Sequence, residues 1–191
     1  MKILTLALLA SVAATPILAE ETREMGAHVH GVSKLELAIE GGIVEMNLTS
    51  PGMDIVGFEY AASTDADKDA VKDAIRTLLV SENIVTFPAA AKCRPTGVLA
   101  HLGDDAHGED DHEEHDDHAD ADDHEHQEGG EHTEFNMRYI FACEHPEALT
   151  AIAFPFFERF EHAQEIEAQF VTETGAGAAE IGRDAAVLTL N

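Results

Sequence analysis

The stretch AHVHGVSKLELAIEGGIVEMNL, residues 27–48, predicts a β-hairpin and sets the kind of fold expected for the rest of the chain. Polar and apolar residues alternate over residues 27–39, as in a strand with one buried face. We expect this strand to begin near His28. Gly41-Gly42 then supplies a two-residue turn that tolerates positive φ, and the apolar-rich residues after it form the return strand.

One helix is expected after this hairpin. Thr64 and Asp67 have the spacing of a capping box, in which each side chain bonds the other residue's backbone N–H. Apolar residues then recur at helical spacing and should be buried against the sheet. They are Val71, Ile75, Leu78 and Leu79.

The C-terminal part of the chain adds shorter elements. Residues 146–149 are expected to form a first helical turn, and residues 166–172 alternate in polarity as a strand does. Gly175 and Gly177 indicate a loop, and residues 186–190 a closing edge strand. The whole pattern predicts an α+β domain, with a mainly antiparallel sheet and one or two helices.

The segment from His101 to Glu134 interrupts this pattern. It holds eight of the twelve histidines and sixteen carboxylates, with no Lys or Arg. Strands are expected on both sides of it, at residues 93–102 and 134–143, so the segment should be a long loop at the tip of a hairpin. Such a composition buries too little apolar surface to offset the entropy cost of ordering the chain, so we expect disorder.

Histidines interleaved with carboxylates are typical of sites for borderline divalent cations, zinc first among them. The alternative is a solvated acidic loop that only keeps the protein soluble, but this leaves eight histidines unexplained. The loop histidines are therefore candidate zinc ligands. They are His101, His107, His112, His115, His118, His124, His126 and His132.

Three further histidines lie close to these expected elements. His28 and His30 are two residues apart, so on a strand they would share one face and could supply half of a tetrahedral zinc site. The alternative is a pair of exposed polar residues. His145 follows Cys143 closely and is a weaker candidate ligand, while His162 is expected to be structural or to face solvent.

Residues 1–19, MKILTLALLASVAATPILA, have the basic start, apolar run and small final residue of a signal peptide. Residues 20–191 are then expected to form a single zinc-binding domain. In an exported protein Cys93 and Cys143 are expected to form a disulfide, with a two-thiolate zinc site as the alternative. No other apolar run is long enough to insert the mature chain in a membrane.

The formal net charge of −27 argues against nucleic acid and anionic membranes as partners. An enzyme is not expected. His112 and His115 frame two glutamates, but the spacing is one residue short of the H-E-x-x-H motif of zinc proteases. Nickel or copper remains an alternative cargo, because imidazole also suits these metals. A structural envelope protein that binds no metal is the third possibility.

Several stretches together resemble a known family. They are AHVHGVSKLELAIEGG, LTSPGMDIVGFEY, Cys93, the histidine-rich segment, YIFAC ending at Cys143, and FPFFERF at residues 154–160. In this order they resemble the ZrgA-like periplasmic zinc-uptake proteins of Gram-negative bacteria. The resemblance implies a periplasmic protein that captures or buffers zinc for uptake. It also implies a TonB-linked or other envelope importer as partner, with His28, His30 and the loop histidines as zinc ligands.

The composition of the loop generates a first prediction. In metal-free protein, residues 104–131 should exchange their backbone amide protons without protection, and zinc should slow this exchange in part, because ligand binding orders the chain. Hydrogen–deuterium exchange with and without a chelator measures both states. Strong protection in the chelated protein would contradict the expected disorder.

Overall fold

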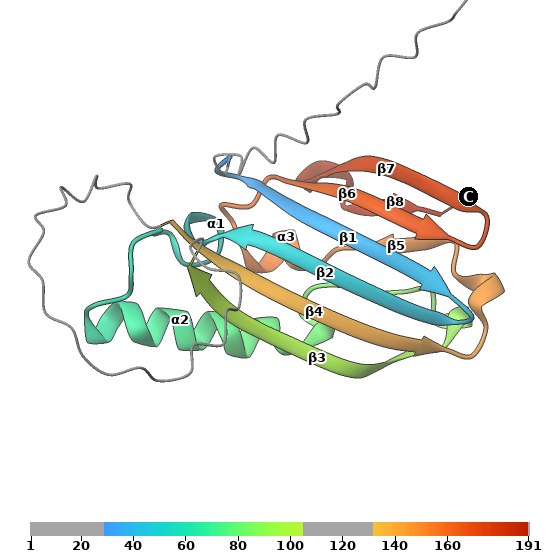
Figure 1. Ribbon diagram of the computed structural model, residues 1–191, viewed down its shortest axis with the longest axis horizontal. Coiled ribbons are helices and arrows are strands. Elements are labelled where there is room, and N and C mark those ends of the chain that lie inside the picture. The colour runs from blue at the N-terminus through green and yellow to red at the C-terminus, as the bar shows by residue number, and fades with distance from the viewer. Residues whose placement is uncertain (1–28, 105–131, 191) are drawn as a thin grey trace, which may run out of the picture.

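The computed structural model describes residues 29–104 and 132–190, which form one mixed sheet backed by helices and a small second sheet (Figure 1). The predicted signal peptide lies outside these ranges, as does most of the segment 101–134. The six-stranded sheet has the order β3-β4-β2-β1-β6-β7. Its strands are β1 (Val32–Glu40), β2 (Ile43–Pro51), β3 (Cys93–Asp104), β4 (Thr133–Cys143), β6 (Glu165–Thr172) and β7 (Gly175–Gly182).

Shorter elements complete the described residues. Strands β5 (Ala151–Ala153) and β8 (Val187–Thr189) pair in a sheet of their own. The α-helices are α1 (Gly52–Val56), α2 (Asp65–Leu78) and α3 (Phe156–Arg159). Single 3-10 turns lie at Ser81–Asn83, Ala89–Ala91, Pro146–Ala148 and Arg183–Ala185. The predicted α+β class is therefore confirmed, and the helical turn expected near Pro146 is a 3-10 turn.

The first hairpin forms as predicted. Strands β1 and β2 are antiparallel, with Leu37 opposite Met46. Both turn glycines have positive φ, 55° at Gly41 and 82° at Gly42. A Cβ on Gly42 would also lie 2.9 Å from the carbonyl oxygen of Cys143, so this turn requires glycine for two reasons.

The second hairpin is also confirmed. Strands β3 and β4 pair along their whole length, from Cys93 opposite Cys143 to Asp104 opposite Thr133. The two cysteines form a disulfide at the end of the hairpin that lies farthest from the histidine-rich segment. All eleven residues in β4 face alternately inward and outward, and the inward ones are buried. The bridge therefore fixes one end of a long strand pair, and the segment leaves from the other end.

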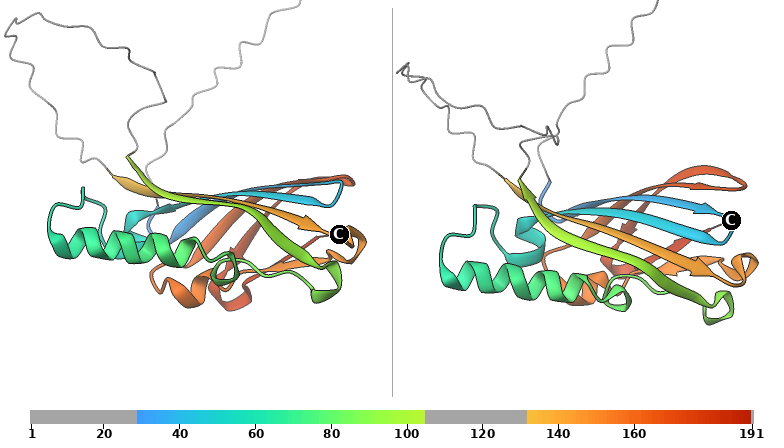
Figure 2. Two further views of the ribbon diagram at one scale, coloured as in Figure 1. Left: turned by 90° about the horizontal axis from the view of Figure 1, so that it is seen from below. Right: turned by 60° about the horizontal axis from the view of Figure 1, so that its bottom comes forward.

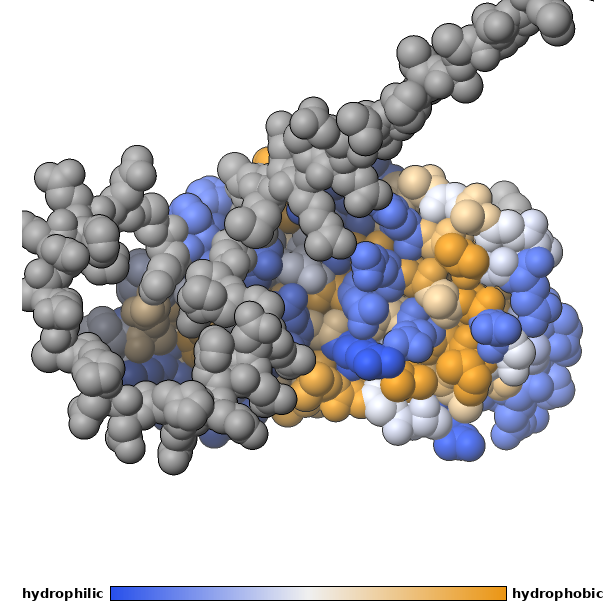
Figure 3. Space-filling model, viewed as in Figure 1, coloured by the Kyte–Doolittle hydropathy of each residue, from blue (hydrophilic) through white to orange (hydrophobic). Residues whose placement is uncertain are grey.

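One face of the sheet carries the hydrophobic core. Figure 2 shows that α2, α3 and the β5–β8 pair all lie on this face. Side chains from β1, β2 and β4 meet the phenylalanines of the FPFFERF stretch, and Phe154 and Phe156 are no more than 2% exposed. The opposite face is open to solvent, and Figure 3 shows hydrophilic and hydrophobic side chains mixed across it. The strands thus alternate between a buried face and a solvated one, as in most antiparallel sheets.

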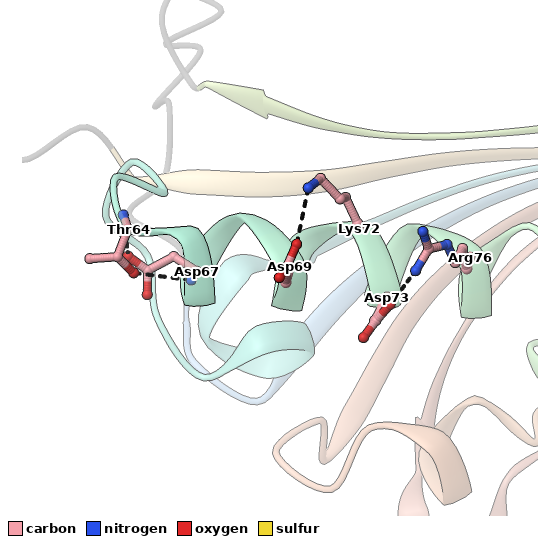
Figure 4. Close-up of polar contacts among 6 residues, drawn as sticks. All are labelled: Thr64, Asp67, Asp69, Lys72, Asp73 and Arg76. Carbon is pink, nitrogen blue, oxygen red and sulfur yellow. Dashed lines mark hydrogen bonds and ion pairs between the residues drawn. The ribbon is translucent and has the colours of Figure 1, made fainter.

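Helix α2 begins with the predicted capping box. The Thr64 hydroxyl accepts the N–H of Asp67, and the Asp67 carboxylate accepts the N–H of Thr64, each at 3.1 Å (Figure 4). Ion pairs of Asp69 with Lys72 and of Asp73 with Arg76 follow along its exposed side. The prediction that Leu79 is buried is wrong. Its side chain is 46% exposed, because the helix ends at Leu78 and the periodicity that buries Leu78 does not extend to Leu79.

Three strand predictions also need correction. The first strand begins at Val32 and not near His28, because Val29, His30 and Gly31 form a turn. Gly175 and Gly177 belong to β7 and not to a loop. Gly177 lies opposite Phe170 on β6, and the Phe170 ring covers it. The small residues of β7 therefore form a strand because the neighbouring strand supplies the side chain that packs over them. The last strand, β8, pairs with β5 and does not close the main sheet.

Tyr139 on β4 generates the prediction for the fold. Its hydroxyl is buried and donates to the carbonyl oxygen of Leu78 at the end of α2, 2.8 Å away, and burial raises its pKa. Tyr139→Phe should lower the free energy of unfolding by about 1–2 kcal/mol, because the carbonyl is left without this donor. Urea unfolding measures the loss. The same change at the exposed Tyr60 is the control, and an equal loss there would contradict this role for Tyr139.

Candidate metal centre

The carboxylate of Glu59 lies between two histidines from distant parts of the chain. His30 Nε2 is 2.9 Å from Glu59 Oε1, and His132 Nδ1 is 3.0 Å from Glu59 Oε2. Both imidazoles are more than half exposed, whereas the Glu59 side chain is only 12% exposed. The histidines therefore approach a fixed carboxylate from the solvent side.

His30 is held by the turn that precedes β1. The next residue, Gly31, has a φ of 87° and is fastened through both of its backbone polar groups. Its carbonyl oxygen accepts the N–H groups of Gln164 and Glu165, at 2.8 and 2.9 Å. Its own N–H donates to Asp54 Oδ1 at 2.7 Å. The backbone beside His30 is therefore fixed by the fold, although it is not part of a strand.

Glu59 and His132 are brought together by the backbone. The N–H of Thr133, the first residue of β4, donates to the carbonyl oxygen of Glu59 at 3.0 Å. His132 immediately precedes Thr133, so the same contact sets its imidazole beside the Glu59 carboxylate. The stretch between α1 and α2, which contains Glu59, is thus attached to the start of β4.

Asp54 is a second carboxylate at this centre and lies on α1. Its side chain is 1% exposed. Burial raises its pKa, while the hydrogen bond from Gly31 and the neighbouring His30 act in the opposite direction. Glu59 and His162 also act on its charge, so the carboxylates of Asp54 and Glu59 lie near the imidazoles of His30 and His162 here. His162 is the residue that the sequence set aside as structural or solvent-facing, and it is 57% exposed.

The present arrangement is a set of paired side chains. Within residues 29–104 and 132–190, no three His, Cys, Asp or Glu side chains are grouped in the geometry that a bound metal ion requires. The chemistry of the donors nevertheless suits zinc, which binds imidazole nitrogen and carboxylate oxygen in proteins. The two imidazoles are exposed and can turn about their side-chain bonds.

The other predicted ligands fall into three groups. His101 lies exposed on β3, opposite Asn136 on the solvated face of the sheet. His145 lies at the other end of the sheet, beside the disulfide, and contacts Glu147 at 3.3 Å. The remaining candidates lie outside the described residues. They are His28, His107, His112, His115, His118, His124 and His126.

Sequence reasoning did not single out Asp54 or Glu59. Both lie in LTSPGMDIVGFEY, a stretch that carries the family resemblance. The signal was present as two acidic residues within that stretch. Their meeting with His30 and His132 depends on tertiary structure, which local spacing does not reveal.

A model of the family described as ZrgA family zinc uptake protein matches residues 27–190, which include every described residue. No curated protein matches the chain. Among the described residues, no helix is long and apolar enough to cross a membrane.

Asp54 generates a prediction about stability. A carboxyl group whose pKa is raised in the folded state stabilises the fold at low pH, where it is protonated. This stabilisation is lost as the pH rises through the folded-state pKa. Asp54→Asn should therefore raise the free energy of unfolding of metal-free protein at pH 7, because no charge is buried and the amide oxygen can still accept the Gly31 N–H. The gain should shrink towards pH 4, near the ordinary aspartate value of 3.8.

Urea unfolding of metal-free protein at pH 7 and pH 4 measures this difference. The exposed Asp184 supplies the control substitution, Asp184→Asn, which should change stability little at either pH. A lower stability of Asp54→Asn at pH 7 would show that the neighbours of Asp54 more than offset the cost of burying its charge.

Proposed function

We propose that this chain, which belongs to the ZrgA family of zinc uptake proteins, captures zinc ions in the periplasm and holds them for an envelope importer. The protein acts as a metal binder in this proposal and not as an enzyme. The predicted signal peptide supports the location, and the family description supports zinc as the cargo.

One observation carries the proposal. His30 and His132 belong to the two parts of the chain in which the sequence places its candidate ligands, and both contact the carboxylate of Glu59. The register of β3 with β4 puts both ends of the histidine-rich segment at this end of the sheet, because Asp104 is opposite Thr133. The candidate ligands His30 and His132 therefore lie at the same end of the sheet as both ends of the segment that carries the other histidines.

We propose a division of labour between the two sets of histidines. The segment 101–134 carries most of the histidines and sixteen carboxylates, and its negative charge raises the local concentration of cations. Ligands gathered from a flexible chain lose more freedom on binding than ligands held in place, so each such site is weaker and releases zinc faster. The segment would therefore collect zinc, and the site with His30 and His132 would hold it more tightly.

Acidification should affect the two sets differently. An imidazole must be neutral to bind zinc, so binding weakens everywhere as the pH falls. In residues 105–131 the carboxylates that alternate with the histidines along the sequence favour the protonated imidazole. The segment is therefore expected to release zinc first between pH 7.5 and about pH 6.

Zinc titrations of three proteins test this proposal. The wild type should bind several ions, in a tight phase followed by weaker ones. A variant with residues 105–131 replaced by a short Gly-Ser linker retains β3, β4 and His132, and should lose weak sites but keep the tight phase. His28→Ala with His30→Ala should weaken the tight phase by about 10-fold or more and leave the weak sites.

Repeating the titrations at pH 7.5 and pH 6 should show the weak phase disappearing first. Competition with nickel and copper under the same conditions measures the preference for zinc. A wild-type protein that binds no zinc at micromolar concentration would contradict the proposed function. If the tight phase of the double histidine variant is unchanged, His28 and His30 are not zinc ligands and are only exposed polar residues.

A further inference from the structure

Three buried side-chain oxygens have no hydrogen-bond partner within residues 29–104 and 132–190. They are Asp54 Oδ2, Glu59 Oε1 and Thr133 Oγ1. Folded proteins rarely bury such atoms unless a water molecule, an ion or a functional role explains them. Glu59 Oε1 does lie 2.9 Å from His30 Nε2, but without the angles of a hydrogen bond, so the contact is an ion pair by distance only.

All three atoms belong to the same end of the sheet. Thr133 is bonded through its N–H to the carbonyl of Glu59. Its hydroxyl lies 2.7 Å from the position that a Cβ on Gly52 would take, at the start of α1. Asp54 is two residues further along α1 and interacts electrostatically with Glu59 and His30. The unpartnered oxygens therefore concentrate where His30 and His132 contact Glu59.

We propose that Glu59 is the carboxylate ligand of a fixed zinc site, with His30 and His132 as its imidazole ligands and Asp54 as a positioning residue. This inference rests on the zinc binding proposed above and adds to it the ligands that belong to the folded domain. Of these residues only His132 belongs to the histidine-rich segment, where it directly precedes β4, so the site is held mainly by the folded domain.

Zinc binding at this site requires the two imidazoles to move. Zinc lies about 2.0–2.2 Å from nitrogen and oxygen ligands, which separates two tetrahedral ligands by about 3.3 Å. The present nitrogen–oxygen distances are 2.9 Å for His30 and 3.0 Å for His132. Each pair must open by a few tenths of an ångström. The two imidazoles contact different oxygens of Glu59 and do not yet form a three-residue metal group, so both must also turn toward one ion. They are exposed and can move while the nearly buried carboxylate stays in place. Glu59 would then exchange its contacts with the two imidazoles for a shared ion.

Asp54 acts on this site through the backbone and through its charge. Its Oδ1 fixes the N–H of Gly31 and thereby the position of His30. Its Oδ2 is a buried acceptor that no described residue satisfies. A cation bound to Glu59 and His30 would offset part of the cost of keeping this carboxylate out of water, so zinc and Asp54 stabilise each other.

The donor set also gives the site a preference among metals. Two imidazoles with carboxylate oxygen suit zinc, whereas an all-oxygen set suits magnesium or calcium and thiolate or thioether ligands suit Cu(I). The described residues hold no free cysteine at this centre, since Cys93 and Cys143 are bonded to each other at the far end. The fixed site would therefore favour zinc over magnesium, calcium and Cu(I), and the competition titrations measure its preference over nickel and Cu(II).

Glu59→Gln in the full-length chain tests the inference. The substitution keeps the shape of the side chain and removes the charged ligand. Zinc competition with a chromophoric chelator should show the tightest equivalent weakened by about 100-fold or more, while the weaker equivalents remain. Asp54→Asn should weaken it by about 10-fold, as loss of a supporting group does. With one equivalent of Co²⁺, the visible absorption spectrum of Glu59→Gln should differ from that of the wild type, because a ligand of the ion has changed.

Two companion variants make the test specific. Glu147→Gln is the matched control, because Glu147 also contacts a histidine, His145 at 3.3 Å, but lies at the other end of the sheet. It should bind zinc as the wild type does. His132→Gln removes an exposed imidazole, so it tests the site even if Glu59→Gln fails to fold.

Each outcome has a distinct meaning. Loss of the tight equivalent in both Glu59→Gln and His132→Gln, with Glu147→Gln unchanged, supports the site. A tight equivalent that survives both substitutions overturns this inference but leaves the proposed function intact. Loss in His132→Gln alone removes Glu59 from the ligand set. Absence of zinc binding in the wild type overturns both proposals.

Discussion

The pairing of β4 with β2 and β3 is the constraint on which the remaining arrangement depends. In this register Phe135 lies opposite Ser50 and Ala142 lies opposite Ile43. The start of β4 therefore adjoins the end of β2, from which α1 and Glu59 follow, while its end adjoins the first hairpin turn. A shift of one residue would turn the buried face of β4 to solvent, so the hydrophobic core itself fixes the register. His132 meets Glu59 because the phenylalanines and Tyr139 of β4 must face inward.

Much of the fold could be predicted because its signals are local. Alternating polarity with Gly41-Gly42 specifies one hairpin, and the capping box at Thr64 marks the start of α2. Two strands around an acidic segment, each bearing a cysteine at its far end, specify the second hairpin. Strand β7 was missed because its packing comes from Phe170 on the neighbouring strand, not from its own small side chains. Leu79 was misplaced because helical periodicity does not reveal the turn that ends α2.

The candidate site was predictable only in part. His30 and His132 stand out because histidine is rare and clustered in this sequence. Asp54 and Glu59 do not stand out among thirty-eight acidic residues, and only burial distinguishes them. The prediction that His28 and His30 share a strand face also assumed the wrong backbone, since His30 lies in a turn. Its position is set by Gly31, which is held by Asp54 on α1 and by Gln164 and Glu165 at the start of β6.

The closed strand pair between Cys93–Cys143 and Asp104–Thr133 has a consequence for how this protein can vary. Everything that determines the register lies on the domain side of residues 104 and 133. The entropy cost of closing a longer loop grows only as the logarithm of its length, by about 0.6 kcal/mol for each doubling. Insertions and deletions between residues 104 and 133 should therefore change the stability of the folded domain very little. The metal-binding capacity proposed for the segment could be tuned in evolution by changes in its length, with the domain inherited intact.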